Sequence, residues 1–483
     1  MGNSGSSLQT CLNAVCNGRS GCVGYPSDPL YQISWVKPYN LDIPVTPVAV
    51  IRPNTAKDVA GIVKCAAAND VKVQAKSGGH SYGYLTMDVI TGVGGTNGEI
   101  AIDMVNFQGF SMNETTWQAT IGSGTRLGDV TKRLHGAGGR AIAHGVCPGV
   151  GIGGHATIGG LGPMSRMWGS CLDHVVGVEV VTADGSIRRA SSTENSDLFW
   201  ALKGAGAGFG IITEFVVRTH PEPGSVVQFT YTITVGSQAD IVPSFKAWQD
   251  LVVDPDLDRR FGTEFIMEPL GCIITGTFYG TQAEFNATGI PAKLPKGGKL
   301  GLTINNWVAS LVQDAENEAL YLTDTPTAFY SKSLAFRPED AIPEAQIRDL
   351  FKWIDGATKG TLLWFVIFDA TGGAVNDVAA NATAYPHRDK FMFYQSYAVG
   401  FPPLPRATRD FLAGVHSRIL AALPVGADAA PHTTYAGYVD PALTDGPQEY
   451  WGSNLPQLEL VKRTWDAADL FSNPQSVRPA SAA

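Results

Sequence analysis

The sequence predicts an α+β fold in two domains, and three observations carry this prediction. The chain has 483 residues, more than one hydrophobic core usually supports. From Val45 onward, short β-rich segments alternate with helical patterns, and beyond residue 224 the strand patterns become longer. The segment His220-Pro-Glu-Pro-Gly224 between the two regions is typical of a boundary. We therefore expect a first domain over residues 1–222, a substrate domain over residues 223–430, and a C-terminal segment, residues 431–483, that returns to the first domain.

The expected elements follow from hydrophobic periodicity. Runs rich in β-branched residues predict strands of the first domain over residues 45–51, 71–75, 100–103, 117–121 and 211–218. Helical spacing predicts helices over residues 55–69, 127–135 and 197–203. Residues 175–182 and 187–190 flank Asp184-Gly185, a pair typical of a hairpin turn. In the second domain, strands over residues 228–235 and 272–279 mixed with amphipathic helices indicate a sheet flanked by helices.

The composition excludes several classes of protein. Hydrophobic residues make up 44% and charged residues 16%, which is typical of a globular chain. A formal charge of −9 offers no basic stripe for phosphate backbones, so we expect no nucleic-acid partner. No apolar run reaches the length of a membrane span. We assign no metal ligands, and we expect a monomer that acts on a small molecule.

The N-terminal residues leave the location of the protein open. Met1-Gly-Asn-Ser-Gly-Ser-Ser7 lacks the apolar core of a secretory signal and fits the pattern for myristoylation at Gly2. Asn-x-Thr sequons at Asn113, Asn286 and Asn381 would suit a secreted glycoprotein. These patterns point in different directions, so both a secreted and an intracellular protein remain open.

The chain has 7 cysteines, an odd number that leaves at least one without an internal disulfide partner. Cys147 is our candidate for the unpaired thiol. The N-terminal cysteines, Cys11, Cys16, Cys22 and Cys65, could pair in an oxidising compartment, and Cys11 with Cys65 is the first pair to test. Spacing alone does not fix the pairing.

Two glycine-rich segments each enclose one reactive side chain. The first is Lys76-Ser-Gly-Gly-His80-Ser-Tyr-Gly83, and the second is His144-Gly-Val-Cys-Pro-Gly-Val-Gly-Ile-Gly-Gly-His155, with Cys147 inside it. Glycine lets backbone amides approach a ligand closely, so glycines around a histidine or a thiol indicate backbone folded against a flat or anionic group. The alternative is a pair of glycine turns with an incidental His and Cys. Taken together, the segments favour a cofactor site.

A dinucleotide-binding dehydrogenase is one alternative for the second segment. Gly149-Val-Gly-Ile-Gly-Gly154 matches the pattern G-x-G-x-x-G, which needs a strand before it and a helix after it. The residues that follow, His155-Ala-Thr-Ile-Gly-Gly-Leu-Gly-Pro163, are a poor helix start. The sequence therefore disfavours this reading.

From the residue-45 region to Phe471-Ser-Asn-Pro-Gln-Ser-Val477, the chain resembles the fungal bicovalent FAD-linked oxidases of the vanillyl-alcohol oxidase superfamily. This group has a PCMH-type FAD-binding domain and includes glucooligosaccharide oxidases and berberine bridge enzymes. The Gly-Gly-His-Ser-Tyr and Cys-Pro-x-Val-Gly motifs carry the resemblance. It implies that His80 bonds to the flavin 8α carbon and Cys147 to flavin C6. A neutral imidazole and a thiolate suit attack on an electrophilic ring.

The resemblance implies further contacts with the FAD. Val150 stands where valine is typical of the oxygen-reactive members, so O2 is the expected acceptor and H2O2 the product. His155 would donate to the flavin N1 and C2 carbonyl side, or else only fill a turn. Backbone contacts to the pyrophosphate and other cofactor contacts are expected at Ser77, Gly78, Gly79, Ser81, Tyr82, Gly151, Gly154, Gly160, Ile211, Asn473 and Gln475.

On the substrate side, the resemblance makes Tyr438 the base that takes the hydroxyl proton while hydride leaves the same carbon. A free phenol has a pKa near ~10, so it needs help near neutrality. Asp369 would help by accepting a hydrogen bond from Tyr438 as the proton shifts. The alternative is a buried tyrosine paired with a structural carboxylate.

The expected sugar contacts are Tyr82, Glu264 and Gln395, but one position departs from the family. Ile367 stands where glucooligosaccharide oxidases carry glutamine, and the loop over residues 83–95 is longer and more apolar than usual. We expect oxidation of an alcohol or hemiacetal hydroxyl, with oligosaccharide as the leading substrate and lactone, then aldonic acid, as products. A tailoring oxidoreductase of fungal secondary metabolism is the rival, and a non-catalytic flavin-binding module is the third alternative.

Overall fold

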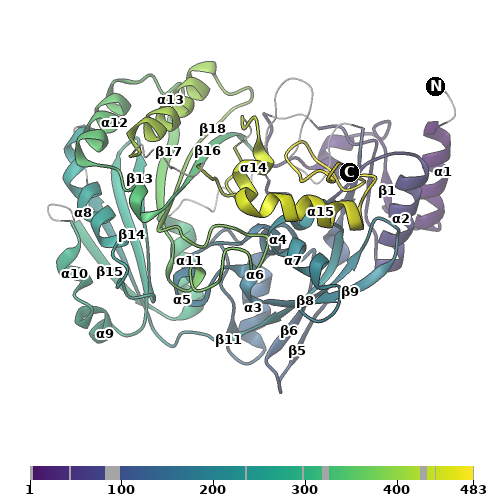
Figure 1. The fold of residues 1–483 in the computed structure, drawn as a ribbon, viewed down its shortest axis with the longest axis horizontal. Coiled ribbons are helices and arrows are strands. Elements are labelled where there is room, and N and C mark those ends of the chain that lie inside the picture. The colour runs from purple at the N-terminus through teal and green to yellow at the C-terminus, as the bar shows by residue number, and fades with distance from the viewer. Residues whose placement is uncertain are drawn as a thin grey trace.

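The computed structural model describes residues 4–42, 45–81, 98–233, 237–295, 299–317, 326–424, 432–440 and 442–481. It combines helices with four sheets, in agreement with the predicted α+β class. One seven-stranded sheet occupies one end of the molecule, and the smaller sheets lie at the other end (Figure 1). The protein is therefore divided into a region around the large sheet and an N-terminal region.

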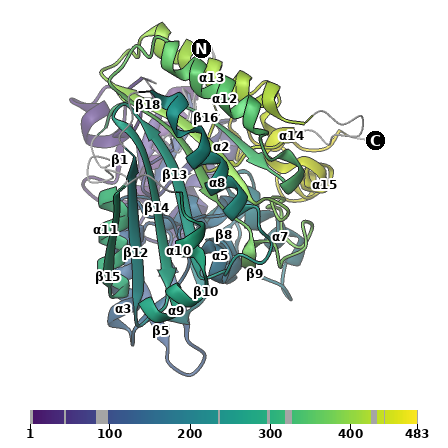
Figure 2. The same ribbon diagram turned by 90° about the vertical axis from the view of Figure 1, so that its left-hand side faces the viewer.

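The large sheet is antiparallel throughout, with strand order β15-β12-β14-β13-β17-β18-β16. Its strands are β12 (Val226–Ile233), β13 (Phe261–Glu268), β14 (Gly271–Tyr279), β15 (Lys299–Asn305), β16 (Ala328–Phe336), β17 (Leu363–Ala370) and β18 (Met392–Gly400). Three helices, α8 (Val242–Val252), α12 (Glu344–Gly356) and α13 (Arg406–Ala422), cover its outer face (Figure 2). Aromatic residues such as Phe245 and Phe351 fill the core between them. Further helices are α9 (Gln282–Ala287), α10 (Ile290–Lys293) and α11 (Trp307–Asn317), the last of which packs on β12 and β15.

The N-terminal region begins with a four-stranded sheet in the order β1-β2-β4-β3. The strands are β1 (Val23–Gly24), β2 (Ala49–Ile51), β3 (Val73–Lys76) and β4 (Ile100–Asp103), and β4 pairs in parallel with both β2 and β3. The helices α1 (Ser4–Cys16) and α2 (Ala56–Ala68) pack beside this sheet. Helix α2 begins after Thr55, whose hydroxyl accepts the backbone N–H of Asp58.

Disulfides fix the N-terminal helix to this layer. Cys11 of α1 is bonded to Cys65 of α2, and Cys16 is bonded to Cys22. The first of these is the candidate pair named from the sequence. Cys147 is a free thiol, as expected, and Cys171 and Cys272 are also free.

A five-stranded antiparallel sheet follows, with the order β5-β6-β10-β8-β9. Its strands are β5 (Phe110–Asn113), β6 (Gln118–Gly122), β8 (Val175–Val181), β9 (Ile187–Ser191) and β10 (Ile211–Arg218), and the short pair β7 (Arg140–Ala141) and β11 (His220–Pro221) lies beside it. The predicted hairpin is confirmed, because β8 pairs with β9 around the Asp184-Gly185 turn. Helices of this layer are α3 (Leu127–Gly136), α4 (Ile152–Ile158), α5 (Ser165–Trp168), α6 (Cys171–His174) and α7 (Ser196–Ala205).

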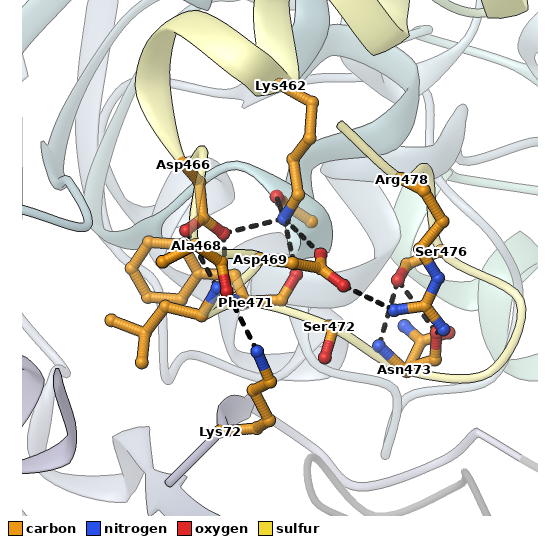
Figure 3. Close-up of polar contacts among 12 residues, drawn as sticks. Lys72, Lys462, Asp466, Ala468, Asp469, Phe471, Ser472, Asn473, Ser476 and Arg478 are labelled. Atoms are coloured by element: carbon orange, nitrogen blue, oxygen red, sulfur yellow. Dashed lines mark hydrogen bonds and ion pairs between the residues drawn. The ribbon is translucent and has the colours of Figure 1, made fainter. Parts of the chain in front are cut away.

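The chain ends in two helices, α14 (Gly446–Trp451) and α15 (Leu455–Trp465), and α15 packs on α7 of the N-terminal region. The Lys462 ammonium is fully buried and donates to the Gly208 carbonyl, the Phe471 carbonyl and Asp466 (Figure 3). Farther along, Val73 donates from its backbone to the Leu470 carbonyl. These contacts hold the end of the chain against β3, the strand that leads into the first glycine-rich segment.

Short one-turn elements complete the described chain, and no helix among them or in the other described ranges is long and apolar enough to cross a bilayer. The one-turn elements are η1 (Gln32–Val36), η2 (Met104–Asn106), η3 (Gly206–Gly208), η4 (Gln238–Ile241), η6 (Pro338–Asp340), η7 (Gly373–Val375) and η8 (Gly452–Asn454).

Candidate active site

A large cavity of about 820 Å³ lies where the N-terminal region meets the inner face of the seven-stranded sheet. Its volume is within the range of ~300–1,000 Å³ typical of sites for small molecules and cofactors. Both glycine-rich segments line it from one side. Residues of β13, β16, β17 and β18 and the segment over residues 435–439 line it from the other.

The two glycine-rich segments lie directly against each other. A Cβ atom added at Gly78 would lie 2.4 Å from the backbone nitrogen of Gly151, and one added at Gly151 would lie 2.1 Å from the backbone nitrogen of Gly78. Ser77 fixes the arrangement because its hydroxyl donates to the Ser123 carbonyl at 2.6 Å. Only glycine permits this contact between two backbones, which explains why each segment has glycine at the point of contact.

The contact brings the two reactive side chains together. The Cys147 sulfur lies 4.0 Å from Nδ1 of His80, and both residues line the large cavity. The His80 ring stacks on Tyr39, with ring centroids 4.6 Å apart. A thiol and an imidazole at this separation can both reach one edge of the same planar ring.

His155 lines the same cavity from α4 and is a neutral donor. Its Nε2 accepts the backbone N–H of Gly145 at 3.0 Å, which leaves the ring hydrogen on Nδ1. Burial, with the nearby His144, lowers the pKa of His155 to about 3. The ring therefore offers a hydrogen bond without a charge.

The residues present fit a flavin dinucleotide. Gly154 lines the cavity and has no atom within 4 Å of the position of a Cβ, so its surroundings leave room for a ligand. Backbone of Ser77, Gly78 and Gly79 faces the same space, as a pyrophosphate requires. His80 and Cys147 would supply the two nucleophiles for the ring.

Across the cavity lie Tyr438 and Asp369, the two residues expected from the sequence to act as an acid–base pair. The side chain of Tyr438 is hydrogen-bonded to the Asp369 carboxylate, and Nε2 of Gln395 donates to Oδ2 of the same carboxylate at 3.2 Å. Burial raises the pKa of Asp369 to about 7 against the effect of these hydrogen bonds. A carboxylate with this pKa can take a proton from a phenol and release it near neutral pH.

Buried polar contacts hold the Tyr438 segment in place. Ser333 donates to the Tyr438 carbonyl at 2.6 Å, and Lys332 forms a buried ion pair with Asp440 at 2.8 Å. Gln475 donates to the Asp440 carbonyl at 2.9 Å. The Tyr435 hydroxyl, three residues before Tyr438, accepts the backbone N–H of Gly160 at 2.7 Å. The position of the phenol thus depends on both regions of the molecule.

An aromatic wall, formed by Tyr39, Phe329, Phe365, Tyr397 and Phe401, lines the outer part of the cavity. Tyr397 stacks on Phe329 and packs against Phe365, each with centroids 5.0 Å apart. None of these residues was predicted from the sequence to lie in the site. The alternation of Leu363, Phe365, Ile367 and Asp369 along one strand was the available signal, because alternate residues share a face.

Several predicted residues do not line the large cavity, and Tyr82 with residues 83–95 lies outside the described residues. Ile211 points into the core beside β3, and the next residue, Ile212, lines the cavity instead. The Asn473 side chain accepts the backbone N–H of Gln475 in a turn. The Gln475 side chain donates to the Asp440 carbonyl, and the backbone N–H of Gly160 donates to the Tyr435 hydroxyl. Ile367 is 3% exposed and lies in register with Gln395 and Ile266.

The expectation about the Gly149–Gly154 motif was wrong in one respect. Helix α4 does begin at Ile152, inside the motif, and ends at Ile158 before two glycines with positive φ. No strand ends directly before the motif, since residues 142–150 contain no strand. The dehydrogenase interpretation therefore fails because no strand precedes the motif, although a helix follows it.

Comparisons with known proteins agree with this geometry. Residues 47–191 match the family described as FAD binding domain, and residues 434–478 match that described as berberine and berberine like. The FAD-linked oxidoreductase sorD of Penicillium rubens is 38% identical, over 99% of both chains.

Solved structures extend the likeness to the whole fold. The xylooligosaccharide oxidase from Myceliophthora thermophila C1, in complex with xylobiose, has a TM-score of 0.88 at 29% identity, over 99% of this chain and 100% of that one. The glucooligosaccharide oxidase from Acremonium strictum, with 6-S-cysteinyl, 8α-N1-histidyl FAD, has a TM-score of 0.87 at 28% identity over 99% of this chain and 100% of that one. The chain belongs to the berberine bridge enzyme-like family of FAD-linked oxidoreductases.

Proposed function

We propose that the protein is an oxidase that removes hydride from a hydroxyl-bearing carbon of a small molecule, with FAD bound through both His80 and Cys147. One observation carries the proposal: the hydrogen-bonded pair of Tyr438 and Asp369 belongs to the same site as the His80 and Cys147 pair. The two pairs come from opposite sides of the cavity. A substrate between them would meet a base and a ring acceptor at once.

Tyr438 and Asp369 handle the hydroxyl proton. The substrate hydroxyl donates its proton to the Tyr438 oxygen while the phenol proton passes to Asp369 through the existing hydrogen bond. Asp369 must start as a carboxylate, and its pKa near 7 leaves it available for this at neutral pH. Gln395 keeps the carboxylate oriented by donating to Oδ2.

Bound FAD would supply the redox chemistry, accepting the hydride and passing two electrons to O2 to give H2O2. His80 and Cys147 would hold the ring, and neutral His155 would donate a hydrogen bond to its polar edge. Val150 lines the cavity beside Cys147, and its modest side chain leaves space for O2. A double tether through His80 and Cys147 would keep the ring in place in an open site.

Carbohydrate is the leading substrate class. Glu264 and Gln395 line the cavity close to Tyr438 and can accept and donate hydrogen bonds to sugar hydroxyls. Aromatic side chains such as Tyr397 can pack on a sugar ring. The relative solved with xylobiose supports this class, and oxidation of a hemiacetal would give a lactone.

A second candidate, a tailoring oxidation of an apolar hydroxylated metabolite, is favoured by a different observation. Leu363 and Phe365 form an apolar strip that lines the large cavity, on the face of β17 that also carries Asp369. With the aromatic wall, this strip offers few hydrogen-bond partners to a second or third sugar. The relative named sorD, an FAD-linked oxidoreductase, fits this candidate equally well.

A peroxide-release screen separates the two candidates. Holoenzyme is supplied with O2 and either oligosaccharides or hydroxylated aromatic and polyene compounds. Turnover of sugars supports the carbohydrate assignment, whereas turnover of apolar compounds alone overturns it in favour of the second candidate. Tyr438→Phe is the control, because loss of turnover in this variant excludes peroxide from a background reaction and a non-catalytic flavin module.

A further inference from the structure

A second, smaller cavity lies behind the acid–base pair. This inner cavity has a volume of about 60 Å³, enough for a few water molecules. Glu264 and Tyr438 line both cavities, whereas Asp369 lines only the inner one. The remaining wall includes Thr275, Thr277, Asp314 and Thr371, together with residues 161–163 and Ser165.

The register of the sheet places these polar residues in rows. Asp369 of β17 is opposite Glu264 of β13, which is opposite Thr275 of β14, so all three share one face of the sheet. Thr277 lies two residues along β14 on the same face, opposite Gly262, where the Pro163 carbonyl lies 2.6 Å from the position of a Cβ. Asp314, near the end of α11, closes the far end and accepts from Thr277 at 3.1 Å.

Three polar atoms of the inner cavity have no hydrogen-bond partner within the described part of the protein. They are Oδ1 of Asp369, Oγ1 of Thr371 and Oδ2 of Asp314. These residues are 9%, 3% and 8% exposed, respectively. A buried polar atom without a partner costs about 1–3 kcal/mol. Polar cavities of this kind are typically filled by water that satisfies such atoms.

We propose that the inner cavity holds a short chain of water through which the proton received by Asp369 moves to Asp314. This inference rests on the proposed function. Asp314 acts through Asp369 and does not touch the substrate, so it is a positioning residue for the reaction. The proton moves from the substrate hydroxyl to Tyr438, from Tyr438 to Asp369, and from Oδ1 of Asp369 through water to Oδ2 of Asp314.

The atoms and electrons balance. The substrate carbon gives up a hydride with two electrons, and the hydroxyl gives up the proton. Oxidation of an alcohol by O2 to a carbonyl and H2O2 releases no net proton, so the inner cavity only stores or exchanges it. Tyr438 ends neutral and Asp369 returns to a carboxylate, ready for the next substrate.

The two carboxylates are matched in proton affinity. Burial raises the pKa of Asp369 to about 7, and burial also raises that of Asp314 to about 7, although Gln228 and Thr277 donate to Asp314. A proton can therefore move between them at little cost in free energy. The titratable groups facing Asp314 and the inner cavity from the packed strands are Tyr279 of β14 and Glu264 of β13.

The test compares single-turnover and steady-state kinetics of Asp314→Asn holoenzyme. We expect anaerobic flavin reduction to stay within about twofold of the wild-type rate, because Asp369 can still accept one proton. The steady-state kcat should fall at least about tenfold, with a larger solvent deuterium isotope effect. An unchanged kcat would overturn the proposal, and so would an equal fall in both rates, which would indicate a structural role.

A second variant keeps the test decisive if Asp314→Asn does not fold. Thr371→Val removes a hydroxyl that has no partner in the described protein, so it should lower kcat without loss of stability. Unchanged kcat in this variant contradicts the water chain. Asp377→Asn, an exposed residue paired with Arg259, is the matched control. A normal rate of flavin reduction in Asp369→Asn would contradict the proposed function itself. Failure of the proposed function can therefore be told apart from failure of the water chain.

Discussion

Substitution of Asp369 by asparagine probes the acid–base pair while preserving its shape. Asparagine can still accept a hydrogen bond from Tyr438, but it cannot take the proton. General base catalysis of this kind contributes about 10²–10⁴-fold in rate, which corresponds to about 3–5 kcal/mol in the barrier. We expect the rate of anaerobic flavin reduction, followed by absorbance, to fall by this factor.

The pH dependence gives a second readout from the same variant. With a pKa of about 7 for Asp369, the carboxylate fraction is roughly a tenth at pH 6 and roughly nine-tenths at pH 8. The reduction rate of the wild type should therefore rise about tenfold between these values. The Asp369→Asn rate should lack this rise.

In the wild type, a rise in pH should lower stability while it raises the rate of flavin reduction. The folded pKa of Asp369 lies above its unfolded value, so between these values the folded state binds more protons and loses stability as pH rises. Asparagine does not titrate. The Tm of the variant minus the Tm of wild type should therefore be larger at pH 8 than at pH 5. A normal reduction rate with an unaltered pH profile in the variant would refute the role of Asp369, and Asp377→Asn should match wild type throughout.

The remaining predictions concern the framework around the site. Gly151→Ala should abolish flavin incorporation, measured by visible absorbance per protein, because a Cβ there would lie 2.1 Å from Gly78; normal absorbance would contradict this contact. Lys462→Met should leave Asp466 buried without its partner, costing about 3–5 kcal/mol and several degrees of Tm, whereas an unchanged Tm would speak against the anchor. Cys11→Ser should cost about 4 kcal/mol by opening the loop closed with Cys65, seen as lower Tm in non-reducing buffer but no difference under reduction.

The sequence was sufficient for elements whose signal is local. Thr55 before an amphipathic run predicts the start of α2, and the Asp184-Gly185 turn predicts the β8–β9 hairpin; both are confirmed. The proximity of His80 and Cys147 was predicted only through the family resemblance. Their separation of 67 residues leaves no local signal, and the backbone contact of Gly78 with Gly151 exists only in the folded chain.

The roles of residues that depend on strand register could not be predicted from the sequence. Ile211 and Ile212 are both apolar, and only the position of β10 in its sheet decides which side chain lines the cavity. From the sequence pattern, Asp314 cannot be distinguished from a solvent-facing polar residue of an amphipathic helix. Its burial beside Gln228 and Thr277 follows from the packing of α11 on the sheet, which periodicity does not specify.

Covalent attachment of FAD is tested most directly by whether FAD stays with the denatured polypeptide. Protein is precipitated in acid, and the pellet and supernatant are compared by flavin absorbance and by intact mass. Wild type, His80→Ala and Cys147→Ala should each keep flavin in the pellet through at least one bond, whereas the double variant should release it. Free FAD in the supernatant of the wild type would contradict covalent attachment through His80 and Cys147.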